Sequence, residues 1–299
     1  MSGRPTGRNL SNEALTDAVL ESFEGAASER FREIAESLVR HVHGFVTDVG
    51  LTEDEWFAGI DFLTRTGHIT NDKRQEFILL SDVLGVSMLV IGLNNRKPAG
   101  ATEATVFGPF FVAGSPLVEH GGDIANGASG TACFVSGSIL STDGTPIGGA
   151  RIEVWQADDE GLYDVQHVGL HAPQGRGHLF SAADGSFSFW TVRPEAYPIP
   201  TDGPVGDLLA AAGRGPMRPA HIHFRVEAAG YETLTTHVFA AGDEFLDGDA
   251  VFGVKGSLIA HFVEHEPGTA PDGSIRADPF ATMEYDLVLA SARSGGGGT

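Results

Sequence analysis

The hydrophobic pattern of this chain changes its period near Asn94. From residue 11 to about residue 95, apolar residues recur every three or four positions, which is the period of an α-helix. Beyond Asn94, β-branched residues alternate with polar ones, and Gly and Pro become frequent, as in short strands joined by turns. A chain with these two patterns is expected to form a helical part followed by a sheet-rich part.

Three helices are expected in the first part. Ser28 is the candidate N-cap of SERFREIAESLVRHVHGFVTDVG, and a second helix is predicted from Thr52 in LTEDEWFAGIDFLTRTGHI. The third, NDKRQEFILLSDVLGVSMLVIGLNN, is apolar on nearly all sides from Phe77, so we expect it to be buried against the rest of the protein or a second subunit. The apolar stripe expected to be buried on the first helix consists of Phe31, Ile34, Leu38, Val42 and Phe45.

The strand-like segments of the second part are TACFVSGSIL, ARIEVWQAD, SFSFWTV, HIHFRVEA and TLTTHVFA. Their spacing favours a β-sandwich over βαβ units, with one helical insert between Gly203 and Gly213. We therefore predict an α+β chain. It would have a helical domain over residues 1–100, an antiparallel β-sandwich domain over residues 101–293 and a flexible Gly-rich tail over residues 294–299.

The chain carries 40 acidic and 19 basic residues, a formal net charge of −21. Nucleic acids and anionic membranes select basic surfaces, so neither is expected as a partner. Cys133 is the only cysteine, which excludes an intrachain disulfide. The first residues lack the apolar core of a secretory signal, and the most apolar run, Phe77 to Leu93, is shorter than the ~20 residues of a membrane span. These features predict a cytoplasmic protein.

The segment RPAHIHF, residues 218–224, places two histidines at positions i and i+2 of a predicted strand. Residues at this spacing face the same way, so His221 and His223 can reach one metal ion. The alternative is a pair of histidines that are satisfied by hydrogen bonds. A cupin metal site also begins with His-x-His, but it is disfavoured here because the glycine and the proline that its motifs require farther along are missing.

Two of the four tyrosines lie in segments that are expected to be loops. Tyr163 ends the acidic turn of WQADDEGLYD, and Tyr197 lies in RPEAYPIPTDGPVG. Loops on a rigid scaffold often carry functional residues. A phenol has a pKa of about 10 in water, but a trivalent cation stabilises the phenolate, and this hard anionic donor favours ferric iron. Two tyrosines and two histidines together would therefore suit an Fe(III) site.

Three motifs resemble those of the intradiol ring-cleavage dioxygenases: GARIEVWQADDEGLYD (149–164), RPEAYPIPTDGPVG (193–206) and RPAHIHF. They occur in the family's order, and the resemblance covers nearly the whole chain, including the helical part. Within the family, ATEATVFGPFFVAGSP (101–116) and GDEFLDGDAVFGVKGSL (242–258) look like the branch that acts on hydroxyquinol. The catechol branch carries a glutamine near the position of His237.

The resemblance implies one non-haem Fe(III) per subunit, bound by Tyr163, Tyr197, His221 and His223. It also implies a homodimer built through the helical domain, in some members with a bound lipid. The substrate would be a small aromatic diol or triol, which O2 cleaves between two oxygenated carbons without an organic cofactor. Tyr197 would act as a base as well as a ligand, and Arg218 would stabilise the negative charge that develops on the substrate.

The substrate pocket implied by this resemblance is mostly apolar, as expected for binding an aromatic ring. Asp82 differs, because a carboxylate in an apolar segment costs free energy unless it is paired. It could accept a hydrogen bond from the third hydroxyl of hydroxyquinol, or it could be an ordinary aspartate on a helix surface. The candidate substrate-binding residues are Leu80, Asp82, Val106, Phe107, Gly108, Pro109, Phe110, Ile199, Pro200, Arg218, His237 and Val251.

Two alternative functions stay open from the sequence. The ring could be catechol or a chlorinated catechol, with the same chemistry. A non-enzymatic β-sandwich could instead bind a metal through His221 and His223 alone. The visible colour of an iron–phenolate bond would distinguish the enzyme from such a module.

Overall fold

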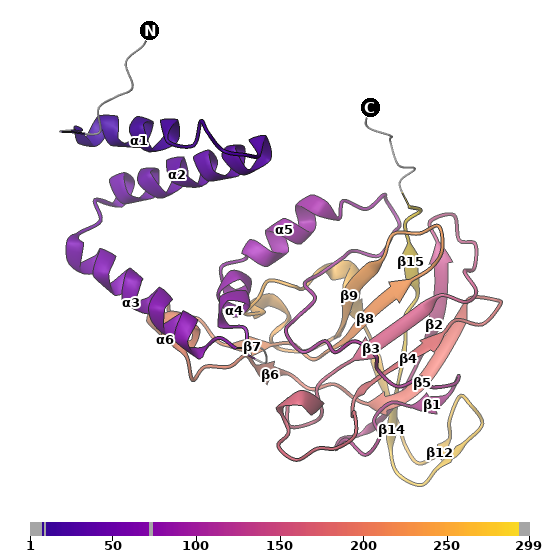
Figure 1. The fold of residues 1–299 in the computed structure, drawn as a ribbon. Coiled ribbons are helices and arrows are strands. Elements are labelled where there is room, and N and C mark those ends of the chain that lie inside the picture. The colour runs from indigo at the N-terminus through magenta and orange to yellow at the C-terminus, as the bar shows by residue number, and fades with distance from the viewer. Residues whose placement is uncertain (1–7, 9, 72–73, 293–299) are drawn as a thin grey trace. The chain divides into compact units, whose positions relative to one another are not determined.

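The computed structural model describes residues 8, 10–71 and 74–292, so the predicted tail over residues 294–299 lies outside the described residues. The chain divides into two compact units, Met1–Thr64 and Arg65–Thr299. The helices are α1 (Asn12–Glu21), α2 (Glu29–Val49), α3 (Glu53–Ile69), α4 (Glu76–Val83), α5 (Val86–Asn94) and α6 (Pro204–Ala211) (Figure 1). The last of these is the insert predicted between Gly203 and Gly213.

Helix α2 exposes the apolar stripe that its sequence predicts to be buried. Its start agrees with the sequence, because Phe31 N–H donates a hydrogen bond to Ser28 Oγ at 3.2 Å. The five stripe residues are nevertheless 48 to 62% exposed, and Ala35 is the buried residue of this helix. Within its unit α2 packs against α1. Helix α1 has 10 residues and α2 has 21, so α1 covers only part of α2.

The prediction of a single apolar helix after Phe77 is wrong, because two helices form there. Gly85 adopts a left-handed conformation with φ 71°, and α4 and α5 meet at an angle of 77°. Helix α4 buries Leu79, Asp82 and Val83, whereas α5 keeps residues such as Leu89 exposed. In the described part of the chain no single helix is long and apolar enough to cross a membrane, and only this bent pair meets that criterion when taken together.

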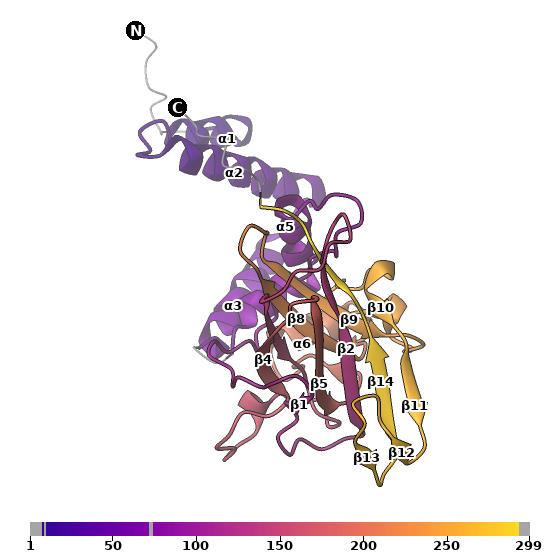
Figure 2. The same ribbon diagram turned by 90° about the vertical axis from the view of Figure 1, so that its right-hand side faces the viewer.

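Two sheets form the second unit. The first has the strand order β1 (Gly122–Asp123), β5 (Ser186–Val192), β2 (Ala132–Ser141), β14 (Phe280–Glu284) and β11 (Phe262–His265), with β15 (Leu287–Leu289) also paired to β2 (Figure 2). The second has the order β10 (Ile259–Ala260), β9 (Leu234–Ala240), β8 (His221–Glu227), β3 (Arg151–Trp155) and β4 (Arg176–Phe180). Two short ribbons pair β6 (Tyr197–Pro198) with β7 (Met217–Arg218), and β12 (Gly268–Thr269) with β13 (Ile275–Arg276).

The α+β class and its sandwich are confirmed, but the sheets are mixed and not purely antiparallel. Strands β14 and β15 pair with β2 in parallel, as do β1 with β5 and β10 with β9. A tight hairpin forces neighbouring strands to be antiparallel, whereas a long connection does not. Strands β14 and β15 come from the far end of the chain and reach β2 by such a connection.

The core between the two sheets fixes which side chains point away from it. Ile222, Phe224 and Val226 of β8 are buried in the same cluster as Phe187 and Phe189 of β5. Side chains alternate between the two faces of a strand. The histidines of β8 therefore lie on the face of the second sheet that is directed away from the sandwich core.

Candidate active site

The two histidines of β8 are oriented by their neighbours. His223 lies opposite Trp155 on β3 and opposite His237 on β9. The Trp155 ring stacks on the His223 imidazole, with 4.7 Å between centroids and 14° between planes. His221 Nδ1–H donates a hydrogen bond to Pro219 C=O at 2.7 Å, which leaves Nε2 with a free lone pair, as in many histidines that bind metals.

Tyr163 follows a tight acidic turn. Asp158 Oδ1 accepts hydrogen bonds from the backbone N–H groups of Glu160 and Leu162, both at 3.0 Å. Gly161 has φ 77°, and a Cβ at this position would come within 2.5 Å of Tyr197 Cβ. The turn therefore needs glycine, both for its backbone conformation and to let the two tyrosines approach each other.

Tyr197 is the first residue of β6 and lies opposite Arg218 of β7. The sequence predicts a loop at this position, and the structure shows a short two-stranded ribbon instead. The same ribbon thus carries a candidate iron ligand on one strand and the candidate electrostatic donor on the other.

The donor atoms of the four predicted ligands converge. Tyr163 Oη lies 3.0 Å from Tyr197 Oη and 2.9 Å from His223 Nε2. His221 Nε2 lies 3.4 Å from Tyr197 Oη and 3.3 Å from His223 Nε2. Ligands that are each about 2 Å from one metal ion lie about 3 Å apart, so this spacing fits a shared ion.

The charge states of these groups also fit a metal ion. Burial lowers the pKa of His221 and His223 well below the usual range, so both imidazoles are neutral and able to donate a lone pair. Burial also raises the pKa of Tyr163 well above its usual range, and the neighbouring Tyr197 adds to this. A phenol that is buried next to neutral imidazoles, as Tyr163 is, ionises readily only if a cation compensates its charge, and a metal ion among these groups would provide that cation.

A third histidine lies close to this centre. His221, His223 and His237 have nitrogen atoms within 4.8 Å of one another, so within the described residues they form a group that could hold a metal ion. His237 is fully buried, its Nδ1 is hydrogen-bonded to Thr105 Oγ1, and its Nε2 has no partner. The two tyrosines approach His221 and His223 within hydrogen-bond distance, so the set of two tyrosines and two histidines is the tighter one.

Arg218 is buried beside the histidines. Its Nε–H donates to Asp249 Oδ1 at 3.1 Å, its Nη1 lies 3.3 Å from His221 Nε2, and its Nη2 has no partner. Burial opposes its charge, but Asp249 and then Tyr197 raise its pKa above the usual range, so the guanidinium stays charged. An unpaired buried donor is costly, so a bound molecule that accepts a hydrogen bond from Nη2 would remove this cost.

A cavity of about 350 Å³ lies beside the four donors. Its wall includes Tyr197 and Arg218, together with Asp82, whose side chain is 4% exposed. Burial raises the pKa of Asp82, while a hydrogen bond with Ser87 and the charge of Arg218 oppose the rise. The other predicted residues that line the cavity are Val106, Gly108, Pro109, Phe110, Ile199, Pro200 and Val251.

Three predicted substrate-binding residues do not line this cavity. Leu80 packs against the apolar cluster of α4 and α6, and its neighbour Leu79 faces the cavity instead. Phe107 contacts the rings of Phe111 and Trp155. His237 lies beside His223 on the neighbouring strand β9, with 4.1 Å between the ring centroids.

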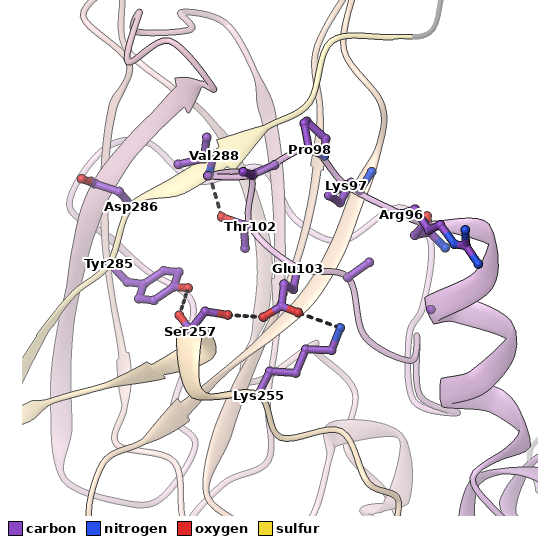
Figure 3. A pocket seen from close by; sticks show the side chains of 16 residues that line it. Arg96, Lys97, Pro98, Thr102, Glu103, Lys255, Ser257, Tyr285, Asp286 and Val288 are labelled. Atoms are coloured by element: carbon purple, nitrogen blue, oxygen red, sulfur yellow. Dashed lines mark hydrogen bonds and ion pairs between the residues drawn. The ribbon is translucent and has the colours of Figure 1, made fainter.

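A larger pocket of about 620 Å³ lies elsewhere in the second unit, along the segment that follows α5 (Figure 3). Its two lysines are paired with carboxylates. Lys255 pairs with Glu103 at 3.2 Å, and Lys97 pairs with Glu232 at 2.7 Å. No His or Cys side chain lines it, so the chemistry of the chain is concentrated in the smaller cavity.

The sequence matches two family profiles. "Catechol dioxygenase N terminus" matches residues 28–102, and "Dioxygenase" matches residues 106–291. Hydroxyquinol 1,2-dioxygenase of Nocardioides simplex is 53% identical over 279 residues, which cover 93% of this chain and 95% of that protein. The 6-chlorohydroxyquinol 1,2-dioxygenase of Cupriavidus pinatubonensis is 57% identical, over 92% of this chain and 96% of that protein.

The chain belongs to the intradiol ring-cleavage dioxygenase family. The solved structure of hydroxyquinol 1,2-dioxygenase from Pseudomonas putida DLL-E4 has a TM-score of 0.88 and 46% identity to this dioxygenase, over 94% of this chain and 99% of that one. The predicted resemblance to the family and to its hydroxyquinol branch is confirmed. The non-enzymatic alternative is wrong, because this chain is an intradiol ring-cleaving enzyme.

The structure of this dioxygenase also reveals residues that the sequence did not single out. Trp155 lies inside a quoted motif, yet only the strand register shows that it stacks on His223. Arg176 forms a buried ion pair with Asp164, the residue after Tyr163. Asp249 is the buried partner of Arg218, and in a chain with 40 acidic residues no sequence signal distinguishes it.

Proposed function

We propose that this dioxygenase cleaves the ring of hydroxyquinol, benzene-1,2,4-triol, between its two adjacent oxygenated carbons. Both atoms of O2 enter the product, 3-hydroxy-cis,cis-muconate, which is a tautomer of maleylacetate. The observation that carries the proposal is the convergence of two tyrosines and two histidines beside a cavity that contains both Arg218 and Asp82. The hydroxyquinol and chlorohydroxyquinol relatives support this choice of ring.

We propose Tyr163, Tyr197, His221 and His223 as the ligands of one Fe(III) per subunit. The iron would supply the activation of the bound ring toward O2. The chain's own groups would handle protons and charge. Tyr197 lines the cavity, and its Oη would accept a proton from a substrate hydroxyl as the ring binds. The free Nη2 of Arg218 would donate a hydrogen bond to the oxygen on which negative charge develops.

The walls of the cavity suit an aromatic triol. Val106, Ile199 and Val251 supply apolar surface against the ring. Asp82 would accept a hydrogen bond from the third hydroxyl, which catechol lacks. His237 is hydrogen-bonded to Thr105 and lies beside His223 without lining the cavity, so it would act on the substrate through the histidines of β8.

A wider hollow of about 870 Å³ shares Leu79, Pro109, Phe110, Gln166 and Pro200 with the cavity. This hollow extends toward the loop that follows Tyr163. We propose it as the route by which the substrate enters.

We also propose a homodimer that is built through the helical domain and binds a lipid there. The support is the exposed apolar stripe of α2, which a single chain leaves in water. Light scattering of Leu38→Glu should show a monomer, whereas Ser37→Glu on an exposed position of the same helix should stay dimeric. A cytoplasmic location stays a prediction, supported by the single buried cysteine.

Oxygen uptake by the purified, iron-loaded enzyme tests the function. Hydroxyquinol and catechol are compared, and Tyr197→Phe provides the correction for autoxidation. We expect kcat/KM for hydroxyquinol to exceed that for catechol by about tenfold or more, the effect of one hydrogen bond to a charged group. Faster cleavage of catechol or a chlorocatechol would keep the chemistry and overturn the ring assignment. Absence of uptake with every ring would overturn the proposed site.

A further inference from the structure

Backbone hydrogen bonds hold the Asp249 carboxylate in place independently of its contact with Arg218. Its Oδ1 accepts a hydrogen bond from Val251 N–H at 3.3 Å, and its Oδ2 accepts one from Gly253 N–H at 2.8 Å. Arg218 Nε–H then donates to Oδ1 at 3.1 Å. Both side chains of the pair are 5% exposed or less. The backbone therefore fixes the carboxylate, and the carboxylate fixes the guanidinium.

The turn that carries Asp249 is held tightly against the strand that carries Arg218. Ala250 N–H donates to Met217 C=O at 3.0 Å, and Arg214 donates to Ala250 C=O at 3.0 Å. Phe252 has φ 59°, a left-handed backbone conformation that residues other than glycine rarely adopt. Such backbone strain persists only where the surroundings enforce it, and it is concentrated at functional sites.

Gly253 closes the turn against the ion pair. A Cβ at this position would come within 3.1 Å of Asp249 Oδ2 and 3.3 Å of Arg218 Nη2. The turn thus leaves no room for a side chain beside the one donor of Arg218 that has no partner.

A second carboxylate lies close enough to Arg218 for their charges to interact. Asp82 lines the same cavity, and its charge interacts with both Arg218 and Asp249. An arginine side chain is long, with five N–H donors, and it pairs readily with any carboxylate within reach. If Asp249 did not hold it, Arg218 could swing onto Asp82, and both groups would then be unavailable to the substrate.

We propose that Asp249 is a positioning residue for ring cleavage. It holds the Arg218 guanidinium in the wall of the cavity, and it keeps Arg218 and Asp82 apart. It reaches the substrate only through these two residues, and the inference rests on the proposed function. Through Val251, the same turn also supplies part of the cavity wall.

The test is a double-mutant cycle on the iron-loaded enzyme, with whichever ring the wild type cleaves. Asp249→Asn keeps an oxygen for the two backbone donors and removes the charge. We expect kcat to fall about 10- to 100-fold, a part of the loss typical for removing an electrostatic donor, with iron content and visible colour unchanged. When Arg218 has already been replaced by Gln, Asp249→Asn should lower kcat by less than about threefold, because the two residues act as one unit.

The matched control is Asp247→Asn, an exposed aspartate of the same segment, which should leave kcat unchanged. An equal loss from Asp249→Asn with and without Arg218 would overturn the proposal, and so would an unchanged kcat. If Asp249→Asn does not fold with iron, Gly253→Ala replaces it in the double-mutant cycle. Its Cβ would lie against both Asp249 and Arg218 and displace the ion pair. A wild type inactive on every ring would count against the proposed function, and 4-nitrocatechol binding to the coloured enzyme would then report on the Arg218–Asp249 pair.

Discussion

Arg176 offers the sharpest test of how the fold holds Tyr163. Its Nε donates to Asp164 Oδ2 at 2.6 Å, its Nη2 bonds Asp164 Oδ1, and its Nη1 donates to Phe110 C=O at 3.1 Å. The Phe110 ring in turn stacks on Tyr163, with 4.6 Å between centroids. One guanidinium therefore joins the turn of a proposed iron ligand to the wall of the cavity.

The cost of losing Arg176 follows from its burial. The side chains of Arg176 and Asp164 are 3% and 6% exposed, and removing one partner of a buried pair costs about 3–5 kcal/mol. Without Arg176, Asp164 keeps hydrogen bonds from Val165 N–H at 2.8 Å and Gln174 N–H at 3.3 Å. We therefore expect Arg176→Met to lower the free energy of unfolding by about 3 kcal/mol, the lower end of this range. Arg176→Lys keeps the charge but cannot bond Asp164 and Phe110 C=O at the same time, so it should lose less stability than Arg176→Met.

Urea unfolding of the metal-free protein measures the stability, and the visible absorption of the iron-loaded protein reports on Tyr163. We expect Arg176→Met to lose stability and iron–tyrosinate absorption together, with Arg176→Lys between it and the wild type. Arg225→Met is the control, because Arg225 forms a half-exposed pair with Glu227, worth about 1 kcal/mol or less. A loss below about 1 kcal/mol for Arg176→Met, with absorption unchanged, would refute the reasoning.

Three further predictions concern the cavity and the ligands. Asp82→Ala should lower kcat/KM for hydroxyquinol about 10- to 150-fold more than for catechol, the effect of one hydrogen bond to a charged group, and equal losses on both rings would contradict this role. Gly161→Ala should displace Tyr197 and reduce bound iron, measured by metal analysis, whereas Gly169→Ala, with φ 83° but open space around its Cβ, should not. Burial lowers the pKa of His221, His223 and His237 below the usual 6.5. The unfolded chain therefore binds protons that the folded one does not, and the melting temperature of the metal-free protein should fall as the pH drops below about 6.5; a flat profile from pH 7.5 to 5 would argue against this.

The sequence predicts the local features of this enzyme well. The period of β8 places two histidines on one face, and the helix cap at Ser28 forms as its pattern indicates. These features depend on residues a few positions apart, and a periodic pattern records such relations directly. The four predicted ligands lie together in the structure, although the tyrosines were found through their motifs and not through any periodicity.

Features that depend on distant parts of the chain could not be predicted. The parallel pairing of β14 with β2 joins segments more than a hundred residues apart, and no local pattern encodes it. The exposure of the α2 stripe depends on what else packs there, whereas its sequence records only that the stripe is apolar. The break at Gly85 is a case of weak local information, because one glycine in an apolar run is compatible with a continuous helix.

The two kinds of ligand are held in different ways, and this difference suits the reaction. His221 and His223 stand in the middle of a sheet, between β3 and β9, with Trp155 stacked on one ring. Tyr197 stands on a ribbon of two residues per strand, outside the main sheets. A short ribbon with few ladder hydrogen bonds moves at lower cost than a strand inside a five-stranded sheet. The proposed ligand that would exchange a proton with the substrate is therefore the one that can shift, while the sheet holds His221 and His223 in place.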